Sequence, residues 1–333
     1  MSSPDGESAP ATLSYAAALV AALDDALASD ARVSIIGTSI LGLGSHRGLL
    51  QRLHQAYPDR IVPPPIAEAS LAAIGAGAAM AGARPFVDFG AAAFSYLAWS
   101  QLVNEAAVAH YMSGGRLTVP VTYHALHGVR GAGGPQHSHS PQAMLCNAPG
   151  LEIVVPSTAA DVYGLLRTAL ASPNPTFILS HAKLLGIEGP MPRERAPIPF
   201  GRAEIKRRGR DITIVATSLM VHYALAAADM LSRDGIEAEI VDPRTLVPLD
   251  EATILDSLAH TGRLVVVDET SLRAGVASDI AGMIAERGFH LLKAPVARVG
   301  RADVPVPYSK PLEEAVTPDA AAIAAAARRV LGA

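Results

Sequence analysis

Short apolar runs alternate with longer segments rich in alanine and leucine along the first half of the chain. The runs are three to six residues long and rich in valine, isoleucine or phenylalanine, which favours buried strands. The longer segments have the length and composition of helices. This alternation predicts strands at 33–36, 84–88, 119–124, 153–155 and 176–180, and helices at 15–28, 49–57, 68–80, 94–111 and 159–171.

The alternation restarts after a segment of different composition. Residues 186–200 contain four prolines and charges of both signs, which is typical of a linker. Beyond this segment the pattern predicts strands at 211–216, 238–241, 264–267 and 296–299, and helices at 221–232, 275–287 and 319–331. Strands that alternate with helices form parallel sheets covered on both faces. We therefore expect an α/β protein of two doubly wound domains, 12–185 and 201–333, joined by the linker 186–200.

Composition and charge exclude several classes of protein. The chain has 333 residues, of which 50% are hydrophobic and 17% charged, so it can bury the cores of about two domains and is not a disordered chain. The net charge of −4 provides no basic field for nucleic acid or for anionic lipid. The single cysteine, Cys146, excludes an internal disulfide framework and a cysteine-rich metal site.

The high apolar content raises the question of a membrane. The longest apolar run, 71–83, has thirteen residues, whereas a membrane-spanning helix needs about 20. The apolar segment 12–23 lacks the preceding lysine or arginine of a signal peptide. We therefore expect a cytoplasmic protein whose apolar surfaces are covered by other subunits.

Histidines gather in one part of the chain. Five of the eleven lie between residues 110 and 140, and two of them, His137 and His139, follow the glycine-rich loop 128–134. Histidine exchanges protons near neutral pH, which favours a catalytic role, although the loop could also be only structural. A zinc site would need a third ligand, and none lies at the usual spacing. Neither a phosphate-binding P-loop nor a G-x-S-x-G hydrolase motif is present.

One acidic residue stands in an otherwise apolar stretch. Glu68 lies in the sequence Ile66–Ala72, at the predicted start of a helix. An acid at this position is either exposed on the first turn and favoured by the helix dipole, or buried as a catalytic carboxylate whose protonation is tuned by its surroundings. The spacing alone favours the first interpretation and leaves the second open.

Seven segments occur in an order that identifies a family. They are PIAE (65–68), GAAMAGARPFVDF (77–89), YMSGG (111–115), VPVTY (119–123), QHS (136–138), PGLEIVVPS (149–157) and ADVPVPYSK (302–310). With these segments the chain resembles the β subunit of thiamine-diphosphate-dependent 2-oxo acid dehydrogenases, which include the pyruvate, branched-chain and acetoin enzymes. The resemblance extends over about residues 12–333. It implies a pyrimidine-binding transketolase-like domain followed by a transketolase C-terminal-like domain.

The resemblance implies roles for individual residues. Glu68 would hydrogen-bond the aminopyrimidine ring of thiamine diphosphate and promote the imino tautomer that removes the C2 proton. Phe94 would pack on this ring. His137 would orient and protonate the substrate-derived group or assist its transfer. Gly90 and Leu97 fall at two positions that touch the cofactor pocket, where bulkier or polar residues are common.

A missing motif implies a partner. The family anchors the diphosphate through Mg²⁺ with a G-D-G motif and a later asparagine, and this sequence contains no G-D-G. The resemblance therefore implies that this chain holds no metal, and that the diphosphate and Mg²⁺ are bound by an α subunit in an α2β2 assembly. The enzyme would be active only with that partner, and would decarboxylate a 2-oxo acid and transfer the acyl group to a lipoyl-domain or acyl-carrier protein.

Departures from the family pattern lead to a second hypothesis. Histidines stand at three substituted positions, His124, His127 and His139, and the family's early acidic segment here reads Gly37–Ile40. Because transketolases bind hydroxylated sugars with several histidines, the chain could instead be a transketolase-like subunit that transfers a hydroxylated two-carbon unit from a ketose. These three histidines would then contact the substrate. A third hypothesis, a non-catalytic β-like scaffold, is disfavoured by the presence of both Glu68 and His137.

Overall fold

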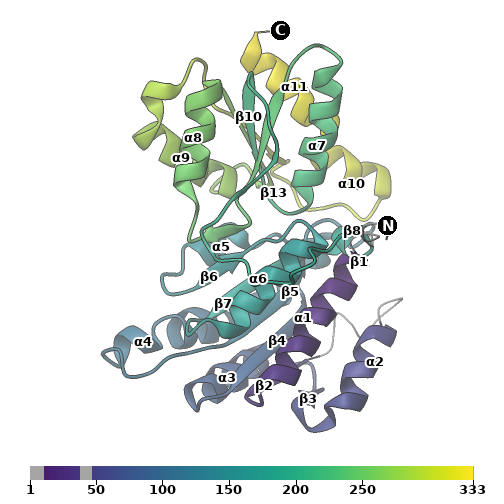
Figure 1. Cartoon of the computed structure of the whole chain (residues 1–333), viewed down its shortest axis with the longest axis vertical. Helices are drawn as coiled ribbons and strands as arrows, with labels where there is room; N and C mark the ends of the chain where they lie inside the picture. Colours follow the sequence, from purple (N-terminus) through teal and green to yellow (C-terminus); the bar gives the residue numbers. More distant parts are fainter. Residues whose placement is uncertain (1–10, 38–46, 333) are drawn as a thin grey trace, which may run out of the picture.

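The computed structural model of the chain describes residues 11–37 and 47–332. The molecule consists of two α/β domains stacked along its long axis, with the N-terminal domain below the C-terminal one in Figure 1. Of the segment Gly37–Ile40, where the family has an early acidic segment, only Gly37 lies within the described residues. In the part of the chain that the structure describes, no helix is long and apolar enough to cross a membrane.

The first domain is built on a seven-stranded sheet in the order β12-β6-β7-β5-β4-β2-β3. All neighbouring strands pair in parallel except β12, which is antiparallel to β6. The strands are β2 (Val33–Ile36), β3 (Ile61–Val62), β4 (Arg84–Ala91), β5 (Thr122–His127), β6 (Glu152–Val154), β7 (Thr176–His181) and β12 (Thr245–Val247). One face is covered by α1 (Tyr15–Ser29), α2 (Arg47–Ala56) and α6 (Ala159–Ala171), and the other by α3 (Glu68–Met80).

The second domain is built on a five-stranded sheet in the order β14-β13-β10-β11-β9, in which only β9 is antiparallel. The strands are β9 (Glu204–Arg207), β10 (Ile212–Ala216), β11 (Ala238–Asp242), β13 (Leu264–Ser271) and β14 (Ala297–Arg301). Helices α7 (Leu219–Ser232) and α11 (Ala320–Leu331) cover one face, and α8 (Glu251–Thr261) and α9 (Val276–Arg287) cover the other. Two mostly parallel sheets with helices on both faces confirm the predicted α/β fold class.

Proline explains one difference from the predicted elements. The strand predicted at 119–124 begins three residues later, as β5 at Thr122. Pro120 has no N–H to donate to a neighbouring strand, so the ladder with β7 begins only beyond it, at Thr122 opposite Thr176. The shift brings His127 into the strand, opposite His181.

The predicted helix 94–111 was wrong as one element. It is divided into a 3₁₀ helix, η3 (Ala92–Ala98), a π helix, η4 (Gln101–Ala106), and a short α4 (Ala109–Met112). Two aromatic residues of η3 contact histidines in a distant loop, which is a tertiary contact that local periodicity does not contain.

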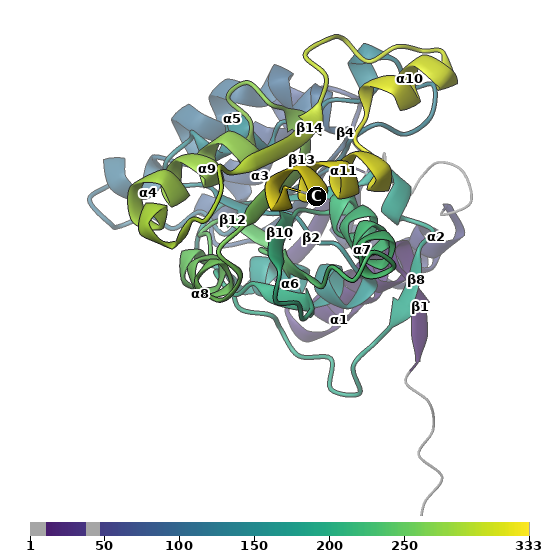
Figure 2. The same ribbon diagram turned by 90° about the horizontal axis from the view of Figure 1, so that it is seen from above.

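Several shorter elements were not predicted. The segment 186–200 contains β8 (Glu188–Pro190), which pairs antiparallel with β1 (Thr12–Ser14) at the margin of the molecule (Figure 2). The helices α8 and α10 (Lys310–Val316) and the strands β9 and β12 were also missed. Short helical turns complete the chain: η2 (Pro58–Arg60), η5 (Pro135–His137), α5 (Gln142–Cys146), η6 (Ala182–Leu184) and η7 (Phe289–Leu291).

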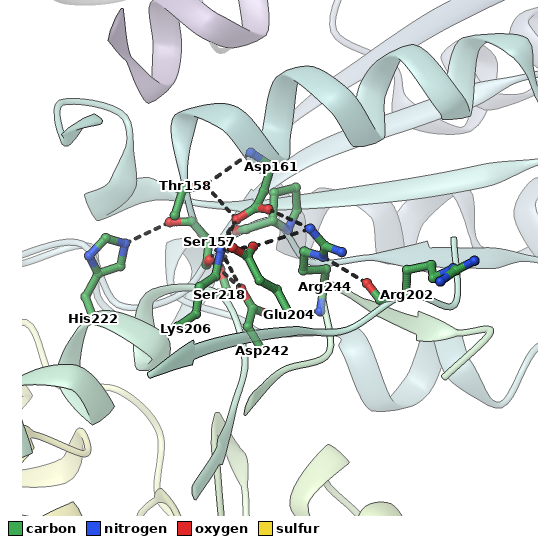
Figure 3. A network of polar contacts seen from close by, with 11 residues as sticks. Ser157, Thr158, Asp161, Arg202, Glu204, Lys206, Ser218, His222, Asp242 and Arg244 are labelled. Atoms are coloured by element: carbon green, nitrogen blue, oxygen red, sulfur yellow. Dashed lines mark hydrogen bonds and ion pairs between the residues drawn. The ribbon is translucent and has the colours of Figure 1, made fainter. Parts of the chain in front are cut away.

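A group of charged side chains with one serine, which we call the interdomain joint, connects the two domains, and both of its aspartates are buried (Figure 3). It consists of Ser157, Asp161, Glu204, Lys206, Asp242 and Arg244. Lys206 Nζ lies 2.8 Å from Asp161 Oδ2 and 3.7 Å from Asp242 Oδ2, while Ser157 Oγ donates to Asp242 Oδ2 at 2.5 Å. Burial raises the pKa of Asp242 to about 7 despite the nearby Lys206 charge. For Asp161, the charge and hydrogen bond of Lys206 outweigh burial and lower the pKa.

Candidate active site

The topology brings three segments to one edge of the first sheet. Strands β4 and β5 are parallel neighbours, so η3, which follows β4, lies beside the loop that follows β5. Helix α3 begins shortly after the end of β3, and this places its first residue at the same carboxyl edge. This edge is where ligands bind in parallel α/β sheets. Glu68, Phe94 and His137, from the three segments, therefore share one edge.

Glu68 is the first residue of α3 and is only 7% exposed. The acid is at the helix N-terminus, as the first interpretation expects, but it is buried rather than exposed, as the second expects. The free N–H groups of the first turn favour a negative charge there. No capping side chain precedes Glu68, since the N-cap residue is Ala67.

Two perpendicular aromatic pairs join η3 to the loop after β5. The ring centroids of Phe94 and His137 are 5.4 Å apart, and those of Tyr96 and His139 are 5.2 Å apart. Phe94 is half-buried, whereas His137 is exposed at the surface, where its imidazole can reach a bound molecule. We call this line of contact, with its four rings, the aromatic seam.

The two remaining cofactor candidates lie on either side of Phe94. Gly90 is buried and has a φ of +75°, and its N–H lies 3.0 Å from Asp88 Oδ1 at a point where the β4–β5 register shifts. A side chain at this left-handed position would be strained, so glycine permits the turn. Leu97, by contrast, is 67% exposed.

The second domain fixes the loop that carries His137. We call residues 128–139 the His137 loop; its ends are joined by a hydrogen bond from Gly128 N to His139 O (3.1 Å). The carboxylate of Glu313, on α10, accepts from Gly131 N (2.9 Å) and Ala132 N (2.8 Å). Glu269, at the end of β13, accepts from Val129 N (2.6 Å). A glycine-rich segment is thereby held in one conformation by two buried acids.

These acids were missed by the sequence analysis, as was Arg301. The family segment ADVPVPYSK ends three residues before Glu313 and could have drawn attention to this acid. Nothing in the sequence, however, connected Glu313 to residues 131 and 132. Arg301 Nη1 donates to Ser138 O at 3.0 Å. Tyr308 lies so close to Gly134 that a side chain at this glycine would meet its ring.

Two of the three substituted histidines are buried in the sheet. His124 and His127 are each 1% exposed, because β5 is a central strand covered on both faces. His124 Nε2 lies 2.9 Å from Ser180 Oγ, and its ring stacks on Phe86. Both side chains are enclosed within the chain, so the predicted contact with substrate receives no support from their burial.

The environment of His127 keeps its ring neutral. Its Nδ1 accepts from Gln142 Nε2 (3.2 Å), which leaves Nε2 to donate to Ser218 Oγ (3.2 Å). Burial, and then the neighbouring His181, lower the pKa of His127 to about 3. His181 in turn donates from Nε2 to Glu269 (2.7 Å), since its Nδ1 accepts from Lys183 N.

His139 differs from these two because it is only half-buried. Burial and the charge of Arg301 lower its pKa, so the neutral ring is favoured. Among residues 11–37 and 47–332, no three His, Cys, Asp or Glu side chains are placed to hold a metal ion together.

Comparisons with known proteins match both domains. The model of the transketolase pyrimidine-binding domain matches residues 11–187, and that of the transketolase C-terminal domain matches residues 201–323. A solved structure described as a split-gene transketolase, inactive β4 tetramer, has a TM-score of 0.79 and 25% identity, over 96% of this chain and 98% of that one.

Similar proteins cover almost the whole chain. The acetoin:2,6-dichlorophenolindophenol oxidoreductase subunit β of Cupriavidus necator is 40% identical over 329 residues, 96% of this chain and 97% of that protein. The mitochondrial pyruvate dehydrogenase E1 component subunit β-2 of Oryza sativa is 38% identical (94% and 84%), and the subunit β of Rickettsia conorii is 37% identical (94% and 96%). The chain therefore belongs to the family of β subunits of thiamine-diphosphate-dependent 2-oxo acid dehydrogenases.

Proposed function

We propose that this β subunit completes the active site of an α2β2 enzyme that decarboxylates a 2-oxo acid and transfers the acyl group to a lipoyl-domain or other thiol carrier. The observation that carries the proposal is the placement of buried Glu68 and of the Phe94–His137 pair at one carboxyl edge of the sheet. The names of the similar acetoin and pyruvate enzymes support the reaction class.

The residues at this edge fit the aminopyrimidine half of thiamine diphosphate. A carboxyl group that is 7% exposed can share a proton with a ring nitrogen, and the half-buried Phe94 ring offers a surface for stacking. When bound, the cofactor supplies the nucleophilic carbon and the electron sink that cleavage beside a carbonyl requires. Gly90 permits the turn that precedes Phe94, and Leu97 is an exposed apolar residue of η3, the element that carries Phe94.

Each of the two titratable residues has a defined task in this proposal. Glu68 holds a proton at the aminopyrimidine nitrogen, in a site where exclusion of water strengthens the hydrogen bond. His137 gives a proton to the substrate oxygen and takes it back, because a ring nitrogen of an exposed imidazole can both donate and accept a proton. The second domain holds His137 in place through Glu269 and Glu313.

We assign the diphosphate and Mg²⁺ to the α subunit. Support comes from large apolar side chains that are exposed on the same side of the first domain. They lie on or next to α3, η3 and α4: Ile66 (86% exposed), Ile74 (52%), Leu97 (67%), Tyr111 (86%) and Met112 (75%). An exposed apolar group of this kind is typical of a surface covered by another protein.

Replacement of Glu68 by glutamine tests the proposal. With the α subunit, E68Q should lower kcat about 100-fold or more with a 2-oxo acid, because the amide cannot exchange the proton. The matched control is E286Q, at an exposed position on α9, which should retain wild-type turnover. An active E68Q enzyme would show that the proton relay is assigned to the wrong residue.

Ketol transfer is the second candidate function. The half-buried His139 beside His137, and the structural similarity to a split-gene transketolase, favour it. Turnover of pyruvate and of a ketose phosphate by the same α/β pair separates the two functions, and turnover of pyruvate alone contradicts ketol transfer. A scaffold without activity would turn over neither compound.

A further inference from the structure

Arg301 is a half-buried cation that has almost no charge compensation from the residues that the structure describes. It ends β14, and one of its five N–H groups donates to Ser138 O (3.0 Å). Its Nε is buried and has no hydrogen-bond partner. Among the residues that the structure describes, no carboxylate forms an ion pair with Arg301.

Arg301 adjoins the aromatic seam. Its hydrogen bond reaches the residue between His137 and His139. Its charge is close enough to lower the pKa of His139, second to burial, and to oppose the rise that burial causes in the pKa of Tyr96. The guanidinium therefore lies at the Tyr96–His139 end of the seam, next to the Phe94–His137 end where the reaction is proposed to occur.

The acids around the His137 loop are engaged elsewhere. Glu313 binds two backbone amides, Glu269 binds His181 and Val129 N, and Asp303 lies 3.3 Å from Arg273.

A second arginine at the loop also lacks an acidic partner among the described residues. Arg130, within the loop, is half-buried, and burial lowers its pKa. Two arginines therefore lie at the loop without a direct carboxylate partner, because the nearby acids bind backbone amides and His181.

Because no acid pairs with this half-buried guanidinium and its buried Nε has no acceptor, the position favours an anion. We propose that Arg301 is a specificity-determining residue that binds a carboxylate or phosphate at the non-reacting end of the substrate. This inference rests on the proposed function of the site. It assigns to this enzyme a substrate with a second anionic group, larger than pyruvate or acetoin.

The non-reacting end is favoured for a physical reason. The carboxylate next to the reacting carbonyl leaves as CO₂ and loses its charge on the way. A cation bound to that carboxylate would stabilise the ground state more than the transition state and would slow the reaction. A distant anionic group keeps its charge throughout, so its binding energy helps to hold the reacting carbon near His137.

The test compares substrates in the α/β enzyme, with reduction of 2,6-dichlorophenolindophenol as the readout. The selectivity ratio is kcat/KM for 2-oxoglutarate divided by that for 2-oxohexanoate, whose tail is neutral. A second ratio compares fructose 6-phosphate with fructose. R301M should lower the ratio for the preferred anion about 10–100-fold, the range for a charged hydrogen bond. R301K should recover part of it, because lysine keeps the charge but not the planar fork.

The control is R298M, at an exposed arginine of the same strand, which should leave both ratios unchanged. Ratios that R301M does not alter overturn the proposal, even where turnover itself confirms the enzyme. Weaker, salt-dependent binding of the α subunit with unaltered ratios shows instead that Arg301 pairs with an acid of the partner, which also overturns it.

A second measurement does not depend on turnover. Succinate and inorganic phosphate are titrated separately into the full chain, and the imidazole signals of His137 and His139 are followed by NMR. The anion that binds should shift the His139 signals in the wild type and shift them at least 10-fold less in R301M. An equal response in both proteins overturns the proposal independently of whether the enzyme is active.

Discussion

Acidic residues connect the two domains in two places, and they do so in opposite ways. In the interdomain joint the carboxylates of Asp161 and Asp242 meet a side-chain cation, Lys206 (Figure 3). At the His137 loop the carboxylates of Glu269 and Glu313 instead meet backbone N–H groups. Figure 2 shows that α10, which carries Glu313, lies at the margin of the second domain, on the opposite side from α8.

This difference gives the two regions different roles: the joint stabilises the arrangement of the domains, whereas the region of the His137 loop can bind a ligand. The charges of the joint largely compensate one another, so the joint can fix the domains but has little capacity left for a ligand. The loop acids accept hydrogen bonds from backbone amides, and Glu269 also accepts from His181. Among the described residues, no acid pairs with Arg130, Arg301 or His137. The second region therefore keeps the uncompensated groups that a binding site needs.

The largest effect is expected when the joint loses its cation. K206M leaves Asp161 and Asp242 buried, 2% and 0% exposed, without their shared partner. The free energy of unfolding should fall by about 3–5 kcal/mol, measured by denaturant titration of the full chain at pH 8. The double variant K206M/D242N should recover part of the loss, because one uncompensated charge is removed. A loss below about 1 kcal/mol would contradict the role given to Lys206.

Breaking the loop contacts should affect activity more than stability. E313Q replaces one of two accepting oxygens by a donor that opposes a backbone N–H, so His137 should lose its fixed position. With the α subunit, kcat should fall about 10–100-fold, and amide exchange at Gly131 and Ala132 should accelerate.

The matched control for this change is E314Q, at the exposed neighbouring position on α10. It should preserve both the turnover and the slow exchange. Faster exchange in E313Q with unchanged kcat would show that the loop need not be held for catalysis.

Titration of Asp242 gives a pH dependence to the joint. Its pKa is about 7 in the folded state and about 3.9 when unfolded. The folded state therefore holds the proton more tightly, and stability is lost as the pH rises from about 4 to 7 and changes little above 7. D242N should remove this loss, so its stability relative to the wild type should rise by more than about 1 kcal/mol between pH 5 and pH 8. If the difference in unfolding free energy between D242N and the wild type is the same at pH 5 and pH 8, the prediction is wrong.

The smallest effect is expected for an ion pair on the surface. Arg328 and Asp234 lie 2.7 Å apart, with side chains 35% and 48% exposed. R328M should change the free energy of unfolding by less than about 1 kcal/mol. A larger loss would mean that burial is not what distinguishes the joint from other ion pairs.

Local pattern predicted much of the framework. Helices α3 and α6 begin and end at the predicted residues, as does β2, because runs of small and apolar residues of the right length specify them directly. Glu68 and His137 were identified by a resemblance that extends over both domains, and the family itself is confirmed. Their roles stay predictions that E68Q and the loop variants test.

Other features depend on contacts between distant residues. Glu313 and Gly131 are 182 positions apart, and β12 joins the sheet of the first domain although it follows β11 of the second. The histidines of β5 resembled substrate ligands in the sequence, but the strand is central and both of its faces are covered.

The sequence by itself determined the fold class, the family and the acid and histidine proposed for catalysis, because these depend on local composition and on motifs in order. Only the tertiary structure decided which histidines face outward, which acids hold the loop and which arginine lacks a counter-ion. Burial and charge compensation are properties of neighbours in space, and those neighbours come from segments that the chain brings together only when both sheets have formed.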